Sequence, residues 1–286
     1  MPAWRASCVT PEAIVPPLTP AAHGPARPDE TVDDLLGGAL RLIQPARGYR
    51  MAVDTVLLAA AVPARAGAQT VELGTGTGAA ALAVAWRTGA RVDGLEVQAP
   101  LAALARRNAA LNGLDGRVRI AEGSLDRPFR DTLPHLVPGR VDHVFANPPY
   151  AAPGEGPASP IPGKTAAHAH ETLDLGHWVD AGHRLLRTKG TLTVIHRADR
   201  LAALVALLHP RFGDTTVLPL WPRAGQSAKR VLVQARKGTR GGSRLLPGLC
   251  LHGAQTRYTP EAEAVLRRGA ALDLADGGAI RETPTP

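Results

Sequence analysis

The sequence predicts an α/β fold: a mixed sheet of seven strands, one of them antiparallel, with helices on both faces. From Thr70 to Leu208, short runs suited to buried strands alternate with longer runs suited to helices. This alternation is typical of parallel strands joined by crossover helices. Two later strands, at 215–220 and 230–235, follow each other with no helix between them, so we expect a hairpin that reverses one strand.

The individual elements follow from local signals along the chain. The first helix stops before Pro63, a later one has Pro100 in its first turn, and Gly113 follows its last residue, as helix termini prefer. A short strand at 40–43 begins the fold. The seven strands of the sheet are expected at 70–73, 91–97, 118–121, 141–146, 191–196, 215–220 and 230–235, and the helices at 53–60, 79–87, 100–112, 175–186 and 199–208. Beyond residue 238 the pattern weakens, with a strand at 245–251 and a last helix at 260–271.

Composition indicates one sizeable core with appendages. The 286 residues are 44% apolar. Residues 1–33 are rich in proline and are predicted to be a disordered extension, residues 34–237 one α/β domain, and residues 238–286 a C-terminal extension partly packed on it. The sequence contains neither an apolar run of 18 residues nor a signal peptide, so a cytoplasmic location without membrane contact is expected.

The net charge of +8 favours a polyanion as partner, with nucleic acid the first candidate. Only 3% of the residues are aromatic, which argues against a sheet that stacks several RNA bases on aromatic rings.

A glycine-rich turn follows the strand at 70–73. Gly74, Gly76 and Gly78 allow a tight turn and a close approach of a ligand to the backbone. Glu96 ends the next strand, 20 residues after Gly76. At that spacing a carboxylate accepts hydrogen bonds from both hydroxyls of an adenosine ribose.

This pattern leaves the cofactor open, because it fits both NAD and S-adenosylmethionine. Glu72, beside the turn, bears on the choice: its negative charge suits the sulfonium and amino groups of S-adenosylmethionine better than the pyrophosphate of NAD.

The segment Asn147-Pro148-Pro149-Tyr150 follows the strand at 141–146 and decides the chemistry. An exocyclic amine of a base is a poor nucleophile, and it needs two acceptors for its two N–H groups. The side-chain oxygen of Asn147 and the carbonyl of Pro148 are the expected acceptors, and the prolines fix the backbone. Tyr150 offers a face on which a flipped base stacks. Catalysis is then positioning, without a metal or a covalent intermediate.

These residues, in this order, resemble class I S-adenosylmethionine-dependent methyltransferases that act on planar nitrogen, which implies a Rossmann-like fold. Four further segments are similar to bacterial transfer-RNA adenine-N6 methyltransferases, which modify the adenine beside the valine-tRNA anticodon. They are QPARGYRMAVDTVLL at 44–58, RNAALNGL at 107–114, His196-Arg197 and PLWPR at 219–223. The similarity covers about residues 35–272.

The resemblance also implies further cofactor-binding residues. It sets the segment of Arg50 and Asp54 over the methionine end of the cofactor, and it sets Gly123 and Ser124 near the adenine. Ser124 departs from the family pattern, which often has an aspartate there. A serine accepts a hydrogen bond more weakly than a carboxylate, so the departure bears on cofactor affinity.

Basic residues of the second half are candidates for the RNA backbone. Those singled out are Lys164, Arg223, Lys229, Arg230 and Lys237. His168 and His170 lack a clear third ligand, so no metal site is predicted.

The sequence therefore predicts N6-methylation of an adenine in RNA, in a tRNA near its anticodon. Glutamine-N5 methylation of a protein release factor is the alternative, although enzymes of that type usually carry an N-terminal helical bundle that the Pro-rich residues 1–33 do not form. DNA adenine methylation ranks third. A non-catalytic RNA- and cofactor-binding protein and an NAD-dependent oxidoreductase complete the alternatives; the intact Asn147–Tyr150 segment argues against the former, and no hydride-transfer constellation supports the latter.

Overall fold

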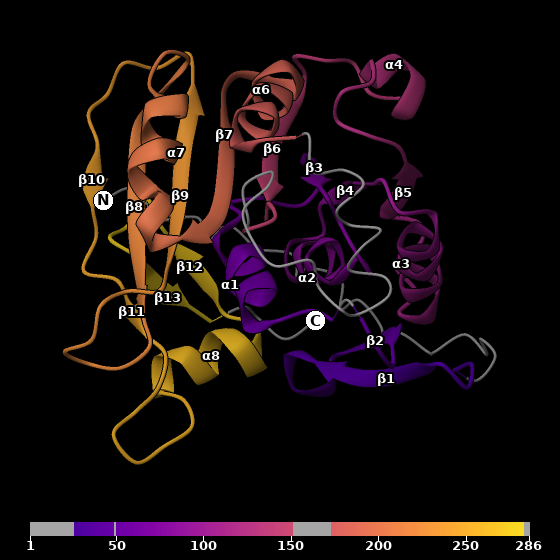
Figure 1. Ribbon diagram of the computed structural model, residues 1–286, viewed down its shortest axis with the longest axis horizontal. Helices are drawn as coiled ribbons and strands as arrows, with labels where there is room; N and C mark the ends of the chain where they lie inside the picture. The colour runs from indigo at the N-terminus through magenta and orange to yellow at the C-terminus, as the bar shows by residue number, and fades with distance from the viewer. Residues whose placement is uncertain (1–25, 49, 151–172, 283–286) are drawn as a thin grey trace, which may run out of the picture.

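One large mixed sheet runs through the computed structural model, which describes residues 26–48, 50–150 and 173–282 (Figure 1). Its long strands are β3 (Gln69–Leu73), β4 (Arg91–Glu96), β5 (Val118–Glu122), β6 (Val141–Ala146), β7 (Leu186–Arg197), β8 (Phe212–Trp221) and β9 (Arg230–Lys237). The order β8-β9-β7-β6-β3-β4-β5 contains one antiparallel strand, β9, which pairs with both β7 and β8. The predicted fold class is therefore confirmed.

Two short strands extend this sheet at the β8 edge. β10 (Arg244–Leu245) and β11 (Leu249–Cys250) both pair parallel with β8, so the sheet has nine strands rather than seven. The single strand predicted at 245–251 is wrong, because Pro247 has no N–H to donate and Gly248 turns the chain with a φ of 94°.

Helices cover both faces of the sheet. They are α1 (Val53–Ala61), α2 (Ala79–Thr88), α3 (Ala99–Leu111), α4 (Phe129–Thr132), α6 (Leu175–Leu185), α7 (Leu201–Leu208) and α8 (Pro260–Arg268), with short 3-10 turns η1 (Leu36–Gly38) and η2 (Ala198–Arg200). Successive residues of a strand point to opposite faces of the sheet, and each face has its own apolar core. Phe145 and Ile195 pack with α1 and α2, whereas Val144 and Val194 pack with α4, α6 and α7. Among the described helices, none is long and apolar enough to cross a membrane.

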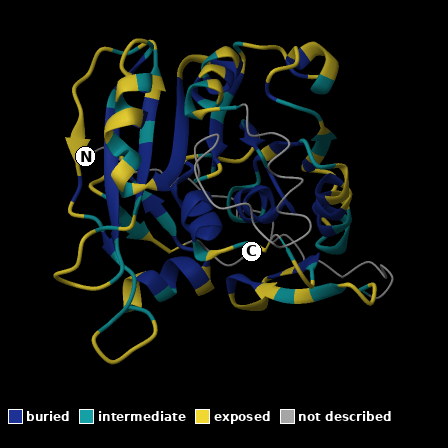
Figure 2. Ribbon diagram, viewed as in Figure 1, coloured by how far each residue is buried: buried dark blue, intermediate teal, exposed yellow. Residues whose placement is uncertain are grey.

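The C-terminal segment completes the core around α1. All residues of α1 after Val53 are buried, and Figure 2 shows α1 in dark blue. Val265 and Leu266 of α8, with Leu272 of β12 (Ala271–Asp273), belong to the same apolar cluster as α1. β12 pairs with β13 (Ala279–Arg281) in a small separate hairpin.

An N-terminal hairpin, β1 (Glu30–Leu35) and β2 (Leu40–Pro45), lies beside α3. β1 shows that the predicted disordered extension, residues 1–33, reaches too far, because residues 30–33 pair with β2. The polar sequence of β1 gives no apolar periodicity. Its stability comes from the ladder with β2 and from an ion pair at 2.5 Å between Arg107 Nη1 and Glu30 Oε1.

Asn108 of α3 and Asn112, which follows the last residue of α3, hold β2 as a neighbouring strand would. Asn108 is fully buried, and its Oδ1 accepts from Ile43 N at 2.7 Å while its Nδ2 donates to Ile43 O at 2.9 Å. The same Nδ2 donates to Thr77 O at 2.9 Å, in the turn that precedes α2. One turn later, Asn112 bonds Arg41 N and O in the same way. Asn108 therefore joins the hairpin, α3 and the glycine turn.

Replacing Asn108 is expected to destabilise the fold strongly. Asn108→Ala leaves Ile43 N, Ile43 O and Thr77 O without their bonds in a buried place, which should lower the free energy of unfolding by about 3 kcal/mol. Asn112→Ala is the matched control, because its contacts with Arg41 are exposed, and it should cost about 1 kcal/mol or less. Urea denaturation measures both, and equal losses would contradict this role of Asn108.

Candidate active site

The carboxyl ends of four parallel strands meet at one edge of the sheet. Register pairs Leu73 of β3 with Leu95 of β4 and with Ala146 of β6, and it pairs Glu96 with Glu122 of β5. The chain runs outward from β3 in both directions, through β4 and β5 on one side and through β6 and β7 on the other. Such a switch point is where open α/β sheets bind ligands.

The glycine turn at this edge is held by Glu96. Gly74, Gly76 and Gly78 all have positive φ, of 68°, 56° and 87°. Glu96 is buried, and its Oε2 accepts from Gly76 N at 2.8 Å while its Oε1 accepts from Gln98 N at 2.9 Å. The carboxylate predicted to meet the ribose therefore also fixes the turn.

Trp178 of α6 packs directly against the same turn. A Cβ on Gly74 would lie 2.6 Å from the Cη2 atom of Trp178, so only glycine fits there. Sequence reasoning missed this contact, because the two residues are far apart in the chain and no local pattern links them.

Glu72 ends up beneath the turn in a buried place. Its Oε2 accepts from the Thr75 hydroxyl at 2.5 Å and from Ala81 N at 2.9 Å, at the start of α2. Burial raises the pKa of the Glu72 carboxyl to about 8, and the nearby Glu96 adds to this rise. The side chain is thus largely protonated at neutral pH in the cofactor-free protein.

Gly123 and Ser124 follow β5 at the same edge. Gly123 N donates to Glu96 O at 2.9 Å, and a Cβ on Gly123 would lie 2.5 Å from Thr132 Cγ2. Ser124 is half-buried. The predicted cofactor-binding residues that follow β3, β4 and β5 are therefore close neighbours.

Asn147 follows β6, on the side of β3 opposite to β4. Its Oδ1 is buried and has no hydrogen-bond partner among the described residues. An unpaired buried acceptor costs about 1–3 kcal/mol, and such an atom in a ligand site indicates a donor supplied by the ligand.

Tyr150 is held by two residues from distant elements. Its hydroxyl donates to Asp54 Oδ2 at 2.5 Å, and Arg230 Nε donates to the same oxygen at 2.9 Å. The Arg230 guanidinium lies over the Tyr150 ring, 4.3 Å from its centroid. Burial, followed by the charge of Asp54, raises the pKa of Tyr150 above its usual range, so the hydroxyl keeps its proton. We refer to Asp54 and Arg230 as the tyrosine clamp.

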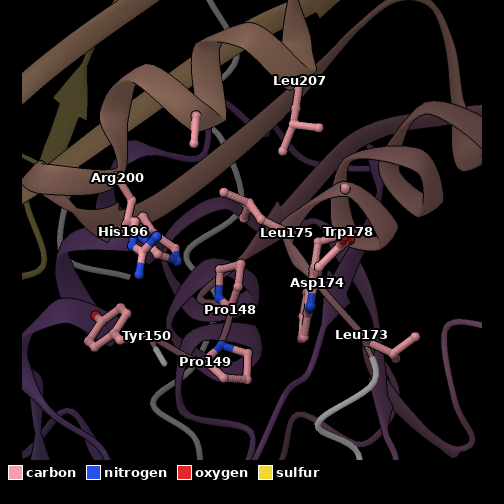
Figure 3. Close-up of a pocket in the computed structure, with 12 residues that line it drawn as sticks. Pro148, Pro149, Tyr150, Leu173, Asp174, Leu175, Trp178, His196, Arg200 and Leu207 are labelled. Carbon is pink, nitrogen blue, oxygen red and sulfur yellow. The ribbon is translucent and has the colours of Figure 1, made fainter. Parts of the chain in front are cut away.

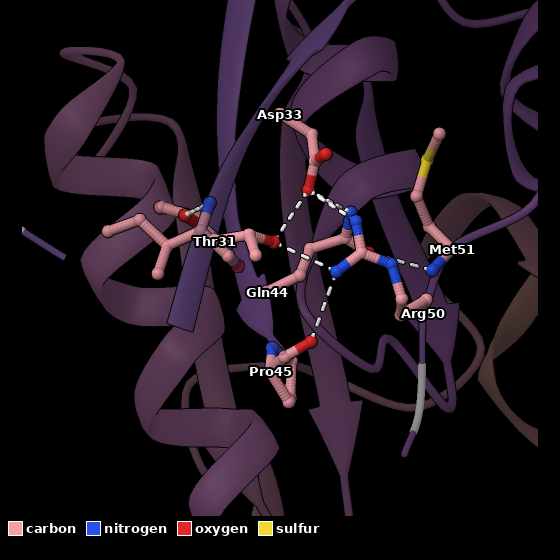
Figure 4. A network of polar contacts seen from close by, with 8 residues as sticks. Thr31, Asp33, Gln44, Pro45, Arg50 and Met51 are labelled. Carbon is pink, nitrogen blue, oxygen red and sulfur yellow. Dashed lines mark hydrogen bonds and ion pairs between the residues drawn. The ribbon is translucent and has the colours of Figure 1, made fainter. Parts of the chain in front are cut away.

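A second network fixes the segment that leads into α1 and Asp54 (Figure 4). Arg50 Nη2 pairs with Asp33 Oδ2 at 2.7 Å, and Arg50 Nη1 donates to Thr31 Oγ1 at 2.8 Å. Gln44 Nε2 donates to the same Asp33 oxygen, and Gln44 Oε1 accepts from Met51 N at 2.8 Å. The β1–β2 hairpin therefore positions the start of α1.

The predicted RNA-binding residues separate into different environments. Lys164 lies outside the described residues. Arg230 belongs to the tyrosine clamp, and Lys237 Nζ donates to His183 O and Leu186 O at 2.7 and 2.6 Å, at the end of α6. Arg223 is exposed and donates to Gly253 O, and Lys229 is exposed. Among the described residues, no group of three His, Cys, Asp or Glu side chains forms a metal site.

The fold, this edge of the sheet and the similarity to known proteins make the chain an S-adenosylmethionine-dependent N-methyltransferase. The chain belongs to the methyltransferase small domain family, whose profile matches residues 50–219. A tRNA1(Val) (adenine(37)-N6)-methyltransferase of Porphyromonas gingivalis is 32% identical over 201 residues, which are 67% of this chain and 75% of that protein. The enzyme of the same name from Dickeya chrysanthemi is 29% identical, over 66% of this chain and 73% of its own length.

Two further comparisons extend this picture. A release factor glutamine methyltransferase of Chlorobaculum tepidum is 30% identical over 161 residues, and the matched part is 52% of each chain. The crystal structure of a predicted O-methyltransferase from Agrobacterium tumefaciens superimposes with a TM-score of 0.63 at 27% identity, covering 76% of this chain and 96% of that one.

A pH titration should reveal the buried carboxyl of Glu72. The unfolded chain loses this proton near pH 4.5 and the folded chain near pH 8. The contribution of the protonated Glu72 to the free energy of unfolding is therefore fully present below pH 4.5 and is lost as the pH rises to about 8. Glu72→Gln has no proton to lose, so its free energy of unfolding should fall less over this range. Denaturant titrations without cofactor measure the difference, and parallel pH profiles would show that Glu72 is not the titrating group.

Removing the tyrosine clamp should act through Tyr150. Asp54→Ala frees the Tyr150 ring and leaves Arg230 without the carboxylate, so we expect kcat to fall about tenfold or more through misplacement of the ring. Tyr150→Phe keeps the ion pair and should have a smaller effect. Both changes break the same hydrogen bond, between the Tyr150 hydroxyl and Asp54. The double variant should therefore be no slower than Asp54→Ala alone. Fully multiplicative losses in kcat would refute the coupling.

Proposed function

We propose that this chain transfers a methyl group to N6 of an adenine in RNA, in a tRNA near its anticodon, and that it acts in the cytoplasm. The observation that carries the proposal is the buried, unpaired Oδ1 of Asn147 at the carboxyl end of β6. The relatives from Porphyromonas gingivalis and Dickeya chrysanthemi, whose names state this activity, support the choice of substrate.

The residues at the sheet edge fit S-adenosylmethionine as the cofactor. Only glycine fits the turn at Gly74, which leaves room for a ligand close to the backbone. The buried acidic side chains of Glu72 and Glu96 and the unpaired Oδ1 of Asn147 lie at the same edge and offer acceptors. We propose that Gly76, Gly78, Gly123, Ser124 and Asp54 complete this site. When bound, the cofactor supplies an electrophilic methyl group.

The acceptor amine is activated by position. Asn147 Oδ1 and the Pro148 carbonyl accept its two N–H groups, which bends the nitrogen toward tetrahedral geometry and points its lone pair outward. Pro148 and Pro149 keep these acceptors in place, because their φ angles are fixed. Tyr150, held by Asp54 and Arg230, offers its ring to the base. The proton leaves after transfer, so the reaction needs neither a strong base nor a metal.

The exposed residues Arg223 and Lys229 are the proposed contacts to the RNA backbone in the described part of the chain. We propose Lys164 as a further contact on charge alone. Arg230 and Lys237 have protein partners, so we propose that they support the site and its surroundings rather than carry the electrostatic attraction.

Glutamine methylation of a release factor is the second candidate. A side-chain amide is also a planar nitrogen with two N–H groups, and Asn147 would accept from it in the same way. The relative from Chlorobaculum tepidum favours this reading, but the chain spans only 52% of that protein.

Labelled S-adenosylmethionine distinguishes the two substrates. With unmodified tRNA, the wild-type chain should produce N6-methyladenosine after digestion to nucleosides. Asn147→Ala removes one of the two acceptors and should lower kcat by about a hundredfold or more, as the loss of one transition-state hydrogen bond does elsewhere. Asn112→Ala, which is far from this edge of the sheet, is the control and should keep kcat near the wild-type value. Label found in a release factor and absent from tRNA would establish the glutamine reading instead.

A further inference from the structure

A pocket lies between the Asn-Pro-Pro-Tyr segment and the start of α6 (Figure 3). Its volume is about 180 Å³. Pro148, Pro149 and Tyr150 line one side, and Leu175 and Trp178 of α6 line another. These flat and apolar walls suit a planar ring. Asn147 does not line the pocket, but Pro148 does, and the Pro148 carbonyl is the other proposed acceptor of the reacting amine. The pocket therefore adjoins the proposed place of that amine.

His196, at the end of β7, gives this pocket a polar group. The residue is only 4% exposed, and its ring meets the Tyr150 ring edge to face with centroids 5.5 Å apart. The backbone of Pro149 acts on the imidazole and raises its pKa, as a carbonyl that accepts from a ring N–H does. Proline has no N–H, so the hydrogen bond runs from a ring N–H to the Pro149 carbonyl.

The tautomer of His196 follows from these contacts. Nδ1 has no partner among the described residues, so Nε2 is the nitrogen that donates to Pro149. Burial lowers the pKa of His196, which keeps the ring neutral. Nδ1 is therefore a buried acceptor, and it is the second unpaired acceptor beside Pro148 and Pro149 after Asn147 Oδ1.

The methylated adenine does not satisfy this second acceptor. The donors of adenine are the two N–H groups of its exocyclic amine, and under the proposed function both go to Asn147 and Pro148. The donor for His196 must come from another part of the RNA. Arg200 and Asp174 also line the pocket, so it has one basic and one acidic side chain beside its apolar walls.

We propose that the pocket binds the nucleotide adjoining the methylated adenine and that His196 Nδ1 accepts a hydrogen bond from it. The donor is an N–H of the neighbouring base or the 2′-hydroxyl of its ribose. This inference rests on the proposed RNA substrate and makes His196 a residue that determines which sequence around the adenine is accepted.

Two isosteric variants separate recognition from folding. His196→Gln places an amide nitrogen near the Nε2 position, so it keeps the bond to Pro149 and loses the acceptor at Nδ1. His196→Asn places an amide oxygen near the Nδ1 position, so it keeps that acceptor and loses the bond to Pro149. We expect His196→Gln to raise the KM for an anticodon stem-loop RNA about tenfold with kcat little changed, and His196→Asn to keep a KM near that of the wild type. Fluorescence anisotropy of the labelled RNA, without cofactor, should show the same order of Kd.

Modified RNAs identify the donor. An RNA in which the adjoining nucleotide is abasic or 2′-deoxy should bind the wild type more weakly. The one of these two changes that removes the donor should cause no further loss of RNA affinity in His196→Gln. The proposal is overturned if His196→Gln binds RNA as tightly as the wild type, or if every RNA change weakens both proteins by the same factor. If the wild type methylates no RNA, the proposed function fails first; if it methylates RNA and His196→Gln is unaffected, only the present inference fails.

Discussion

The parallel alignment of β3 with β4 and β6 is the constraint on which the site depends. Leu73 pairs with Leu95 on one side and with Ala146 on the other, so the residues that follow these strands emerge at the same height. A slip of one residue in either ladder would turn every side chain of that strand to the opposite face. Side chains of different size pack on the two faces, such as Val144 on one and Phe145 on the other, and this packing opposes such a slip.

Buried polar side chains then hold the edge in shape. Glu96 bonds the glycine turn, Glu72 bonds the start of α2, and Asn108 joins the turn to the N-terminal hairpin. Each of these side chains is nearly inaccessible and bonds a backbone atom that the sheet leaves unpaired, in the glycine turn or in the first turn of α2. The same carboxylates are the ones proposed to meet the cofactor, so binding and loop geometry are physically linked.

Beside Tyr150, the basic side chain of Arg230 has protein partners. Arg230 has the charge of an RNA-binding residue, yet it pairs with Asp54 and covers the Tyr150 ring. These contacts hold the Tyr150 ring in place before a flat partner binds. Pre-organisation of this kind reduces the entropy lost when the partner binds.

The sequence by itself determined the order of strands and helices, the glycine turn, Glu96 and the Asn147–Tyr150 segment, because periodicity, proline, glycine and spacing are local signals. The chemistry proposed for that segment also follows from the sequence, because it depends on the atoms that those residue types carry. Only the tertiary structure decided that β1 is a strand, that Trp178 closes on Gly74, and that Arg230 meets Asp54 across 176 residues of chain. Such contacts depend on packing between distant elements, and no local pattern in the chain encodes which distant partner a side chain will meet.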